Sequence, residues 1–412
     1  MGRPGRTGSR PLTAVRDTPL EARVWGRHLI DDAAVQQLEN AMRLPVTVGG
    51  ALMPDAHVGY GIPIGGVVAL DNAVAPYMVG VDIACRVMMS IYPAEDLDLL
   101  ENESRRDQLR RALRSETRFG IGAMFDGRSR REHEVMDDPA WEAVPQLRRL
   151  KDKAWSQLGT SGSGNHFVDA GVLQVGAGEA AALGIEPGRH LAIMSHSGSR
   201  GTGAEVANYF SKVARDIVKL PDGLQHLAWL ELGSEPGQQY WMTMNLMGRY
   251  ASANHHTMHR AIAKALKLKP ELQVENHHNF AWKEFWNGRE VYVHRKGATP
   301  AHAGALGIIP GSQGHDSFIV RGLGNAASLN SAAHGAGRNM SRKKARNTIP
   351  KRDRDAWLAE RGVELMDAGL DEAPQAYKDI REVLAHQSDL IEILATFAPA
   401  IVLMAAGGPA ED

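Results

Sequence analysis

Short apolar runs that end in polar, glycine-rich turns recur along this 412-residue chain. The clearest runs are 191–194, 290–293 and 307–309, and the turns that follow them are 195–201, 294–299 and 310–314. Runs of three or four apolar residues bounded by glycine and polar residues are typical of short buried strands. Because strand ends with tight turns often present reactive groups from a rigid scaffold, we expect the functional residues in these turns.

Amphipathic periodicity predicts helices at about 204–218, 236–266, 355–367 and 386–396. The region 96–156 is expected to be a helical, arginine-rich excursion between strand-rich parts. Strands and helices do not alternate regularly, so we predict an α+β fold of mixed and antiparallel sheets with flanking helices around a central cleft. We expect one domain over 23–404, with a flexible tail at 1–22 and a disordered tail at 405–412.

Composition narrows the possible partners. The hydrophobic content of 43% allows a substantial core, and the net charge of −1 provides no global field that would recruit nucleic acid. A site for a polyanion must therefore be a local basic patch. We expect no membrane segment, because no apolar run reaches eighteen residues. A single cysteine and the absence of an apolar signal sequence predict a reducing, cytoplasmic location.

The single cysteine, Cys85, stands three residues after Asp82. One thiol cannot form an internal disulfide, so Cys85 is either a buried, inert apolar residue or a site of thiolate chemistry. A spacing of three residues lets a carboxylate and a thiolate point at one ion from a helical turn or a tight loop. The residues themselves leave both interpretations open.

Three further segments offer imidazoles. His166 follows Asn165 in 160–167, His196 lies in 195–201, and either His277 or His278 is available in 276–279. A lone histidine is more often structural, but three imidazoles with a thiolate and a carboxylate favour a transition-metal site. The serine- and glycine-rich turns could also hold a phosphate through backbone amides.

Two histidine segments have weaker interpretations. Asp55 and His57 lie in a glycine-dense loop, where they either orient metal ligands or simply stabilise a turn. His255 and His259 have the spacing of a helical metal pair, but the glutamate of the zinc-protease motif is absent. We therefore expect this pair at the surface or lining a cavity.

His334 lies in a turn of small residues, followed by the basic segment 338–346. Small neighbours leave room beside the imidazole, and nearby cations suit nucleophilic attack on a phosphorus centre. Alternatively, His334 is another metal ligand and the basic run is a solvated helix face. Arg200, in the turn after the run 191–194, could add a bidentate phosphate clamp.

Taken in order, these segments closely resemble the RtcB family of RNA-splicing ligases. The resemblance runs from about residue 53 to residue 380 and rests on the strings at 53–59, 79–85, 162–167, 195–201, 277–280, 295–298, 308–312, 318–325, 334–342 and 376–380. So many separate strings in one order make a chance resemblance untenable.

The resemblance implies an RNA ligase that uses GTP and two Mn²⁺ ions. A histidine becomes guanylylated, the GMP passes to an RNA 3′-phosphate derived from a 2′,3′-cyclic phosphate, and a 5′-hydroxyl displaces it, in tRNA splicing or RNA repair. An accessory activating protein would fit the same pattern.

By motif, the resemblance makes His334 the nucleophile and makes the metal ligands Asp82, Cys85, His166, His196 and His278. It places at nucleotide-contacting positions Asn165, Asp169, Ser312, Ala336, Gly337 and Tyr377. It places against RNA or phosphate Arg200, Arg338 and Arg342.

The chain departs from the family pattern at several positions. Asp169 replaces a glutamate, Arg86 replaces a glycine beside the metal site, Gln313 replaces a methionine, and 405–406 lack a terminal lysine. Guanine recognition is therefore expected to be less strict. Two alternatives remain: a metal-dependent phosphoesterase or cyclic phosphodiesterase that does not need His334, and a non-catalytic RNA-end-binding protein in which Arg86 blocks metal loading.

Overall fold

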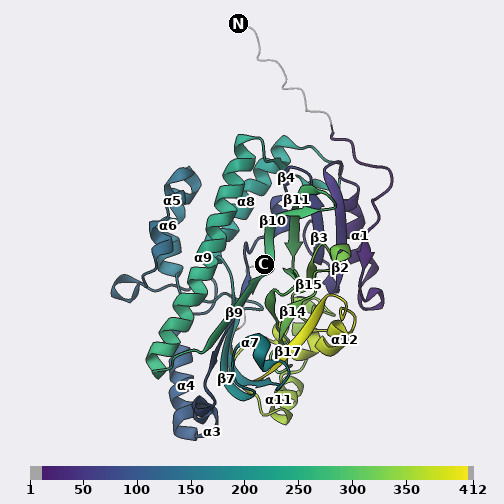
Figure 1. The fold of residues 1–412 in the computed structure, drawn as a ribbon. Helices are drawn as coiled ribbons and strands as arrows, with labels where there is room; N and C mark the ends of the chain where they lie inside the picture. The colour runs from purple at the N-terminus through teal and green to yellow at the C-terminus, as the bar shows by residue number, and fades with distance from the viewer. Residues whose placement is uncertain (1–11, 407–412) are drawn as a thin grey trace.

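A computed structural model describes residues 12–406 (Figure 1). Its largest sheet has eight strands, all antiparallel except for β16 (Glu364–Asp367), which pairs with β17 in parallel. The other seven strands follow the order β13 (Leu306–Ile309), β14 (Ser317–Gly322), β17 (Ile391–Met404), β6 (Phe167–Val175), β7 (Gly188–Ser197), β5 (Arg86–Tyr92) and β9 (Leu272–His277).

A second sheet has the order β1 (Arg23–Val24), β2 (Thr47–His57), β3 (Ile64–Leu70), β11 (Arg289–Lys296) and β10 (Asn279–Trp286). Two short ladders join β12 (Ala298–Pro300) to β15 (Ser331–Ala333), and β4 (Ala73–Val74) to β8 (Leu230–Glu231). Mixed, largely antiparallel sheets with separate helices confirm the predicted α+β class.

Twelve α-helices pack around these sheets in the described residues. They are α1 (Asp32–Met42), α2 (Pro76–Val79), α3 (Asp98–Glu101), α4 (Glu103–Glu116), α5 (Ala140–Ala143), α6 (Pro145–Gln157), α7 (Ala180–Leu183), α8 (Arg200–Ile217), α9 (Glu235–Leu266), α10 (Arg342–Thr348), α11 (Lys351–Glu360) and α12 (Ile380–Ala385). The longest, α9, starts where the Ser234 side chain accepts a hydrogen bond from the backbone N–H of Gly237, which satisfies one free donor of the first turn.

Alternate side chains of β7 pack into two different hydrophobic clusters, one on each face of the eight-stranded sheet. Leu191 and Ile193 face a hydrophobic cluster with α4 and the second half of α9, whereas Ala192 and Met194 face the opposite cluster with β14 and β17. Successive side chains of a strand point to opposite faces, so the apolar run 191–194 is buried on both sides. His196 continues the Ala192 and Met194 series, which places it on the face away from α9.

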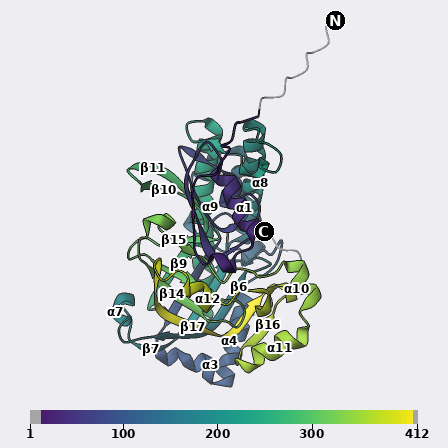
Figure 2. The ribbon, with the colours of Figure 1, turned by 90° about the vertical axis from the view of Figure 1, so that its right-hand side faces the viewer.

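The two large sheets meet at the link between β9 and β10, where His278 is the single intervening residue. Figures 1 and 2 show the part that contains α1, α8, β2 and β3 stacked on one end of the eight-stranded sheet. This junction brings the ends of β5, β6 and β7 next to residues from β2 and β15. The predicted functional turns therefore gather where the sheets meet.

Two helix predictions were wrong. The segment 386–396 holds the turn 386–390 and the start of β17, although its buried residues Gln387, Leu390, Ile391 and Leu394 have helical spacing. Pairing of β17 with β14 on one side and β6 on the other decides the strand, because tertiary context overrides local periodicity. The segment 355–367 likewise divides into α11 and β16.

The predicted excursion 96–156 is helical at both ends, while 117–139 contains only loops and short 3₁₀ turns. Residues 12–22, which we expected in a flexible tail, are bound to the body: Arg16 donates to the carbonyl oxygens of Pro45 and Thr47, both at 3.1 Å. The rest of that tail and 407–412 lie outside the described residues. Among residues 12–406, no helix is long and apolar enough to cross a membrane.

Candidate metal centre and nucleotide pocket

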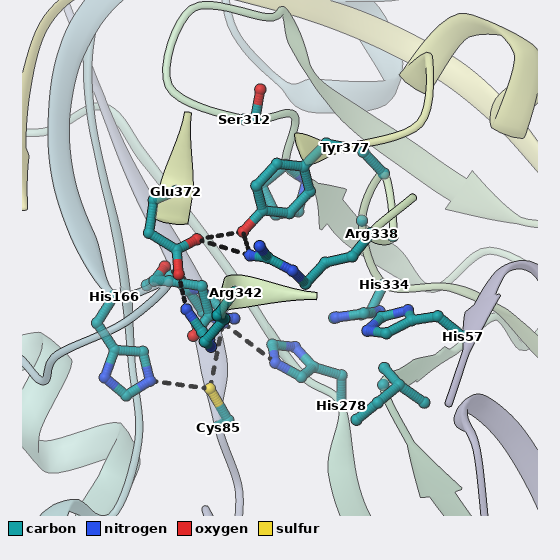
Figure 3. A pocket seen from close by; sticks show the side chains of 18 of the residues that line it. His57, Cys85, His166, His278, Ser312, His334, Arg338, Arg342, Glu372 and Tyr377 are labelled. Carbon is teal, nitrogen blue, oxygen red and sulfur yellow. Dashed lines mark hydrogen bonds and ion pairs between the residues drawn. The ribbon is translucent and has the colours of Figure 1, made fainter. Parts of the chain in front are cut away.

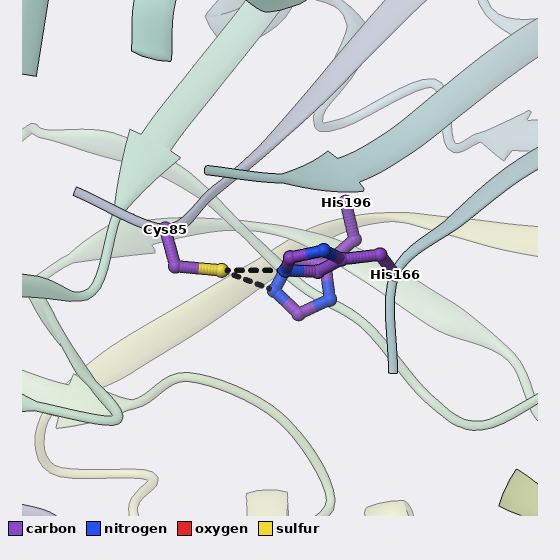
Figure 4. Close-up of side chains that lie close together, drawn as sticks. All are labelled: Cys85, His166 and His196. Carbon is purple, nitrogen blue, oxygen red and sulfur yellow. Dashed lines mark hydrogen bonds between the residues drawn. The ribbon is translucent and has the colours of Figure 1, made fainter. Parts of the chain in front are cut away.

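The five predicted metal ligands converge. Cys85 Sγ lies 3.1 Å from His196 Nε2 and 3.5 Å from His166 Nε2 (Figure 4). His278 Nε2 lies 3.2 Å from His196 Nε2, and Asp82 Oδ2 lies 3.0 Å from His166 Nε2. Atoms bound about 2.0–2.3 Å from one ion lie roughly this far apart, so the donor set fits a divalent metal.

Backbone hydrogen bonds hold the turn that carries Asp82 and Cys85. The Cys85 N–H donates to the carbonyl of Asp82 at 3.2 Å, which closes a tight turn between the two residues. The N–H of His278 donates to the carbonyl of Cys85 at 3.0 Å, and the N–H of Ala84 donates to that of Asn279 at 2.7 Å. The link between β9 and β10 is thereby fixed against the cysteine turn.

Burial keeps the ligands in the protonation states that metals need. His196 Nδ1 lies 3.0 Å from the carbonyl of Asn165, so Nδ1 carries the proton and the Nε2 lone pair faces the cluster. Burial lowers the pKa of His196 to about 3 and that of His278 well below its ordinary value. Burial alone would raise the pKa of Asp82, but its hydrogen bond and attraction to His166 lower it overall. Neutral imidazoles and an ionised carboxylate can all donate to a metal.

His334 lies at the edge of this cluster, directly after β15. Its ring centroid is 4.7 Å from that of His278. The buried carboxylate of Asp55, in β2, accepts from His334 Nδ1 at 2.7 Å and from the His334 backbone N–H at 3.1 Å. Asp55 was expected to orient a metal ligand, but it orients His334, with Nδ1 of that ring turned to the carboxylate.

Small residues after His334 let the chain pass close to β2. Gly337 has φ +72°, and a Cβ at this position would lie 2.0 Å from the carbonyl oxygen of Asp55. Any side chain here would push the turn away from Asp55 and break its two hydrogen bonds to His334. His57, also in β2, donates from Nδ1 to the carbonyl of Asp55 at 3.1 Å and orients no metal ligand.

A cavity of about 620 Å³ opens over the metal ligands and His334, within the size range of small-molecule sites. All the residues predicted to contact a nucleotide line it: Asn165, Asp169, Ser312, His334, Ala336, Gly337 and Tyr377. Figure 3 shows His334 facing His278, with Arg338, Arg342, Glu372 and Tyr377 grouped above Cys85.

One end of this cavity combines an apolar wall with two buried polar groups. Phe167 and Asp169 of β6 pair in register with Met404 and Val402 of β17, and all four line the cavity. Asp169 Oδ1 has no hydrogen-bond partner, and burial raises its pKa well above the ordinary value. Gln313 places Nε2 3.4 Å from Met404 Sδ and leaves Oε1 without a hydrogen-bond partner.

The sequence interpretation missed the acidic pair Asp371 and Glu372, just before the string at 376–380. Glu372 is buried, forms an ion pair with Arg342, and accepts a hydrogen bond from the Tyr377 hydroxyl. Arg338 donates to the Tyr377 hydroxyl at 3.2 Å and to the carbonyl of Asp371 at 2.7 Å. Two of the three arginines predicted to hold phosphate, Arg338 and Arg342, thus line the cavity with their charges balanced by this pair.

Two arginines lie elsewhere than predicted. Arg200 is buried and does not line the cavity: its guanidinium donates to the Thr160 hydroxyl at 3.1 Å and the Gly120 carbonyl at 3.3 Å. Arg86 follows Cys85 but, as the first residue of β5, points to the α9 side. There it forms an ion pair with Glu275 at 2.8 Å and donates to the carbonyl of Gly248. Arg86 therefore does not block the metal site.

His255 and His259 are wrongly predicted as surface or cavity-lining residues. Both are fully buried in α9, behind β7, and both contact the Ser195 hydroxyl, at 2.6 and 2.8 Å. Ser195 precedes His196 on the opposite face of the strand. The histidine pair therefore anchors the strand that carries His196, one of the predicted metal ligands.

Acidification should destabilise the metal-free protein. Burial lowers the pKa of His259 to about 3 and that of His294 to about 4, from 6.5. Between those values the unfolded chain binds protons that the folded chain does not, so the free energy of unfolding falls as the pH drops below about 6.5. Each such histidine contributes up to about 1.4 kcal/mol per pH unit. Melting in chelator should show Tm falling from pH 7.5 to pH 5.5; a constant Tm would contradict this.

Comparison with known proteins agrees with this site. Residues 37–405 match the family described as tRNA-splicing ligase RtcB. The chain is 33% identical to the RNA-splicing ligase RtcB of Escherichia coli (strain K12), over 93% of this chain and 97% of the relative. It is 32% identical to the tRNA-splicing ligase RtcB of Nanoarchaeum equitans, over 90% and 92%, and to the RNA-splicing ligase RtcB of Mycobacterium tuberculosis, over 88% and 98%. This chain belongs to the RtcB family.

Proposed function

We propose that this protein joins RNA 3′-phosphate or 2′,3′-cyclic phosphate ends to 5′-hydroxyl ends through a covalent nucleotide on His334. The enzyme class, RNA ligase, is the one expected from the sequence, and membership of the family confirms it. The observation that carries the proposed chemistry is the Asp55–His334 pair beside the metal cluster. A non-catalytic RNA-end binder would have no need of an imidazole held in this way.

His334 is the nucleophile of the first step. Asp55 keeps the proton on Nδ1, so the Nε2 lone pair attacks the α-phosphorus of GTP. The new N–P bond forms as the bond from phosphorus to the pyrophosphate oxygen breaks. The small side chains at 335–337 leave space for the entering phosphorus.

In this proposal two Mn²⁺ ions would be held by Asp82, Cys85, His166, His196 and His278. Such ions neutralise triphosphate charge and act as Lewis acids. Cys85 Sγ contacts Nε2 of both His166 and His196, so its thiolate would be among the groups that hold the metal. Thiolate and imidazole donors would also accept zinc, cobalt or iron, and the choice of manganese rests on the family resemblance.

Arg338 and Arg342 hold the RNA phosphate in the second and third steps. A 3′-phosphate oxygen attacks the phosphorus on His334 and releases the imidazole, and the 5′-hydroxyl then attacks the 3′-phosphorus and releases GMP. Both arginines line the cavity and now contact Asp371, Glu372 or Tyr377. Guanidinium groups bind phosphate through the same charge-assisted hydrogen bonds that they form with carboxylates, so an incoming phosphate would compete with the acidic pair for them. Arg200 supports the loop beside His166 instead.

Asp169 recognises the base in this proposal. Asp169 Oδ1, which has no partner, would accept from the guanine N1–H or amino group, and these donors would favour the ionised form that burial alone disfavours, while Val402 and Met404 supply an apolar wall. Gln313 Nε2 can donate to the guanine carbonyl, because positions 405–406 are alanines and offer no side-chain donor. We therefore expect GTP to be preferred over ATP, though less strictly than in the family pattern.

Asp169→Asn should lower the preference for GTP. The substitution keeps the size of the side chain but replaces one oxygen acceptor by an NH₂ donor. Losing one polar contact typically costs about 1–3 kcal/mol, which corresponds to roughly a five- to 150-fold change in the preference. Labelling of the protein in mixtures of GTP and ATP should show this loss, with Gln174→Asn on the same strand as control. An unchanged ratio would remove Asp169 from base recognition.

The direct test of this function is an RNA-joining assay with Mn²⁺ and GTP. RNA with 3′-phosphate and 5′-hydroxyl ends should be joined, and RNA with 3′-hydroxyl and 5′-phosphate ends should not. A metal-dependent phosphoesterase, the second candidate, would release phosphate or open the cyclic phosphate without joining, and would not need GTP. That pattern would replace the ligase proposal.

The single buried thiol suits a reducing compartment, so we propose that the reaction takes place in the cytoplasm.

An activating partner would act by promoting metal or nucleotide exchange in the cavity. Joining by the purified chain at full rate would make such a partner unnecessary.

A further inference from the structure

A second group of metal-binding side chains lies outside the cavity. His28 belongs to the 3₁₀ turn η1 (Arg27–Leu29), whereas Glu382 and His386 belong to α12 and the residue after it. One ligand atom from each of the three lies within 4.8 Å of the others, and His28 Nε2 is 3.5 Å from Glu382 Oε1. The rings of His28 and His386 meet edge to face, with centroids 4.6 Å apart. None of the three lines the cavity.

The backbone positions these side chains in advance. Glu382 and His386 are four residues apart, so they share one face of the last helical turn, where the His386 N–H donates to the Glu382 carbonyl at 3.3 Å. On the other side, Gly26 has φ +59°, and a Cβ there would lie 3.3 Å from His386 Cβ. Trp25 Nε1 donates to Asp389 at 3.0 Å, which ties the two segments together.

We propose that His28, Glu382 and His386 form a second divalent-metal site, for zinc, that clips the N-terminal segment 23–30 to α12. Two imidazoles and one carboxylate are a common zinc ligand set, with water in the fourth position of the tetrahedron. All three side chains reach solvent, and His28 and Glu382 are 60% and 48% exposed. Small rotamer changes can therefore bring the ligand atoms around one ion without moving the backbone.

The role of this site is structural. Gln387 follows His386 and accepts a hydrogen bond from the backbone N–H of Ala333 at 2.8 Å, one residue before His334. Fixing His386 therefore also fixes a support of the strand that presents the nucleophile. Nothing in this arrangement depends on the proposed RNA chemistry.

The test counts zinc on the full chain, without a histidine tag and stripped of metal, by titration against a chromophoric chelator. The double variant His28→Ala/His386→Ala should bind one zinc fewer than the parent protein. His302→Ala is the matched control, because His302 lies 3.4 Å from Glu284 and is similarly exposed but has no second imidazole. It should bind as many as the parent.

The parent, the double variant and the His302→Ala control all keep the cluster around Cys85. Zinc bound at that cluster therefore adds equally to the three zinc counts. Added zinc should also raise the Tm of the parent and the control by more than that of the double variant. Circular dichroism spectra that match the parent show that the double variant folds. Equal zinc counts in all three proteins, or an equal loss in the control, would overturn the proposal.

Discussion

His334→Ala should abolish covalent attachment of nucleotide to the protein, with no residual labelling. Nδ1 of the His334 ring contacts the buried carboxylate of Asp55, and the ring lies beside His278 of the candidate metal cluster. Alanine has no side-chain nitrogen, so this variant cannot form the bond to phosphorus. The measurement is incubation with α-labelled GTP and Mn²⁺, followed by a denaturing gel. RNA joining should be lost with the label.

His57→Ala is the matched control for this experiment. His57 also lines the cavity and lies beside His334 in Figure 3, but its Nδ1 contacts the carbonyl of Asp55 rather than the carboxylate. This variant should keep measurable labelling. Labelling that persists in His334→Ala, or that disappears only in His57→Ala, would assign the nucleophile to another residue.

Cys85→Ser should remove metal from the cluster and stop ligation, while the fold remains. Serine is slightly smaller than cysteine and fits the same buried turn, but its hydroxyl is a poor substitute for a thiolate that faces two imidazoles. Manganese content after dialysis should fall by at least one equivalent, and joining should fall below detection. Circular dichroism should be unchanged.

Arg86→Lys provides the control for this second experiment. The residue adjoins Cys85 in sequence, but its side chain pairs with Glu275 on the other face of the sheet. Lysine keeps that charge, so manganese binding should be retained. If Cys85→Ser keeps full metal and full activity, the thiol is a packing residue and the cluster must be reassigned.

The fold was predictable where local patterns and tertiary contacts agree. The run 191–194 is apolar at every position because β7 is buried on both faces, and the helix at 236–266 lies within α9. The prediction failed at 386–396, where Gln387, Leu390, Ile391 and Leu394 have helical spacing, although the first two lie in a turn and the last two in β17. Contacts with β14 and β6, which are distant in the sequence, decide that element.

The site was predictable as a set of residues rather than as an arrangement. The sequence motifs and the family resemblance selected five candidate metal ligands and His334, which the structure brings together, but they could not show that Asp55 orients His334 rather than a metal ligand. Nor could they show that Arg86 turns away from Cys85, since this depends on where β5 begins. Glu372 was missed because its role comes from contacts with Arg342 and Tyr377, which lie in other segments.

The most direct test of the account is to map the nucleotide on the protein. After reaction with GTP and Mn²⁺, neutral or basic digestion and mass spectrometry should find one GMP on the peptide that contains His334, in an acid-labile bond. Cys85→Ser should yield none. A protein that joins RNA with no adduct, or with the adduct on a different residue, would contradict the central role of His334.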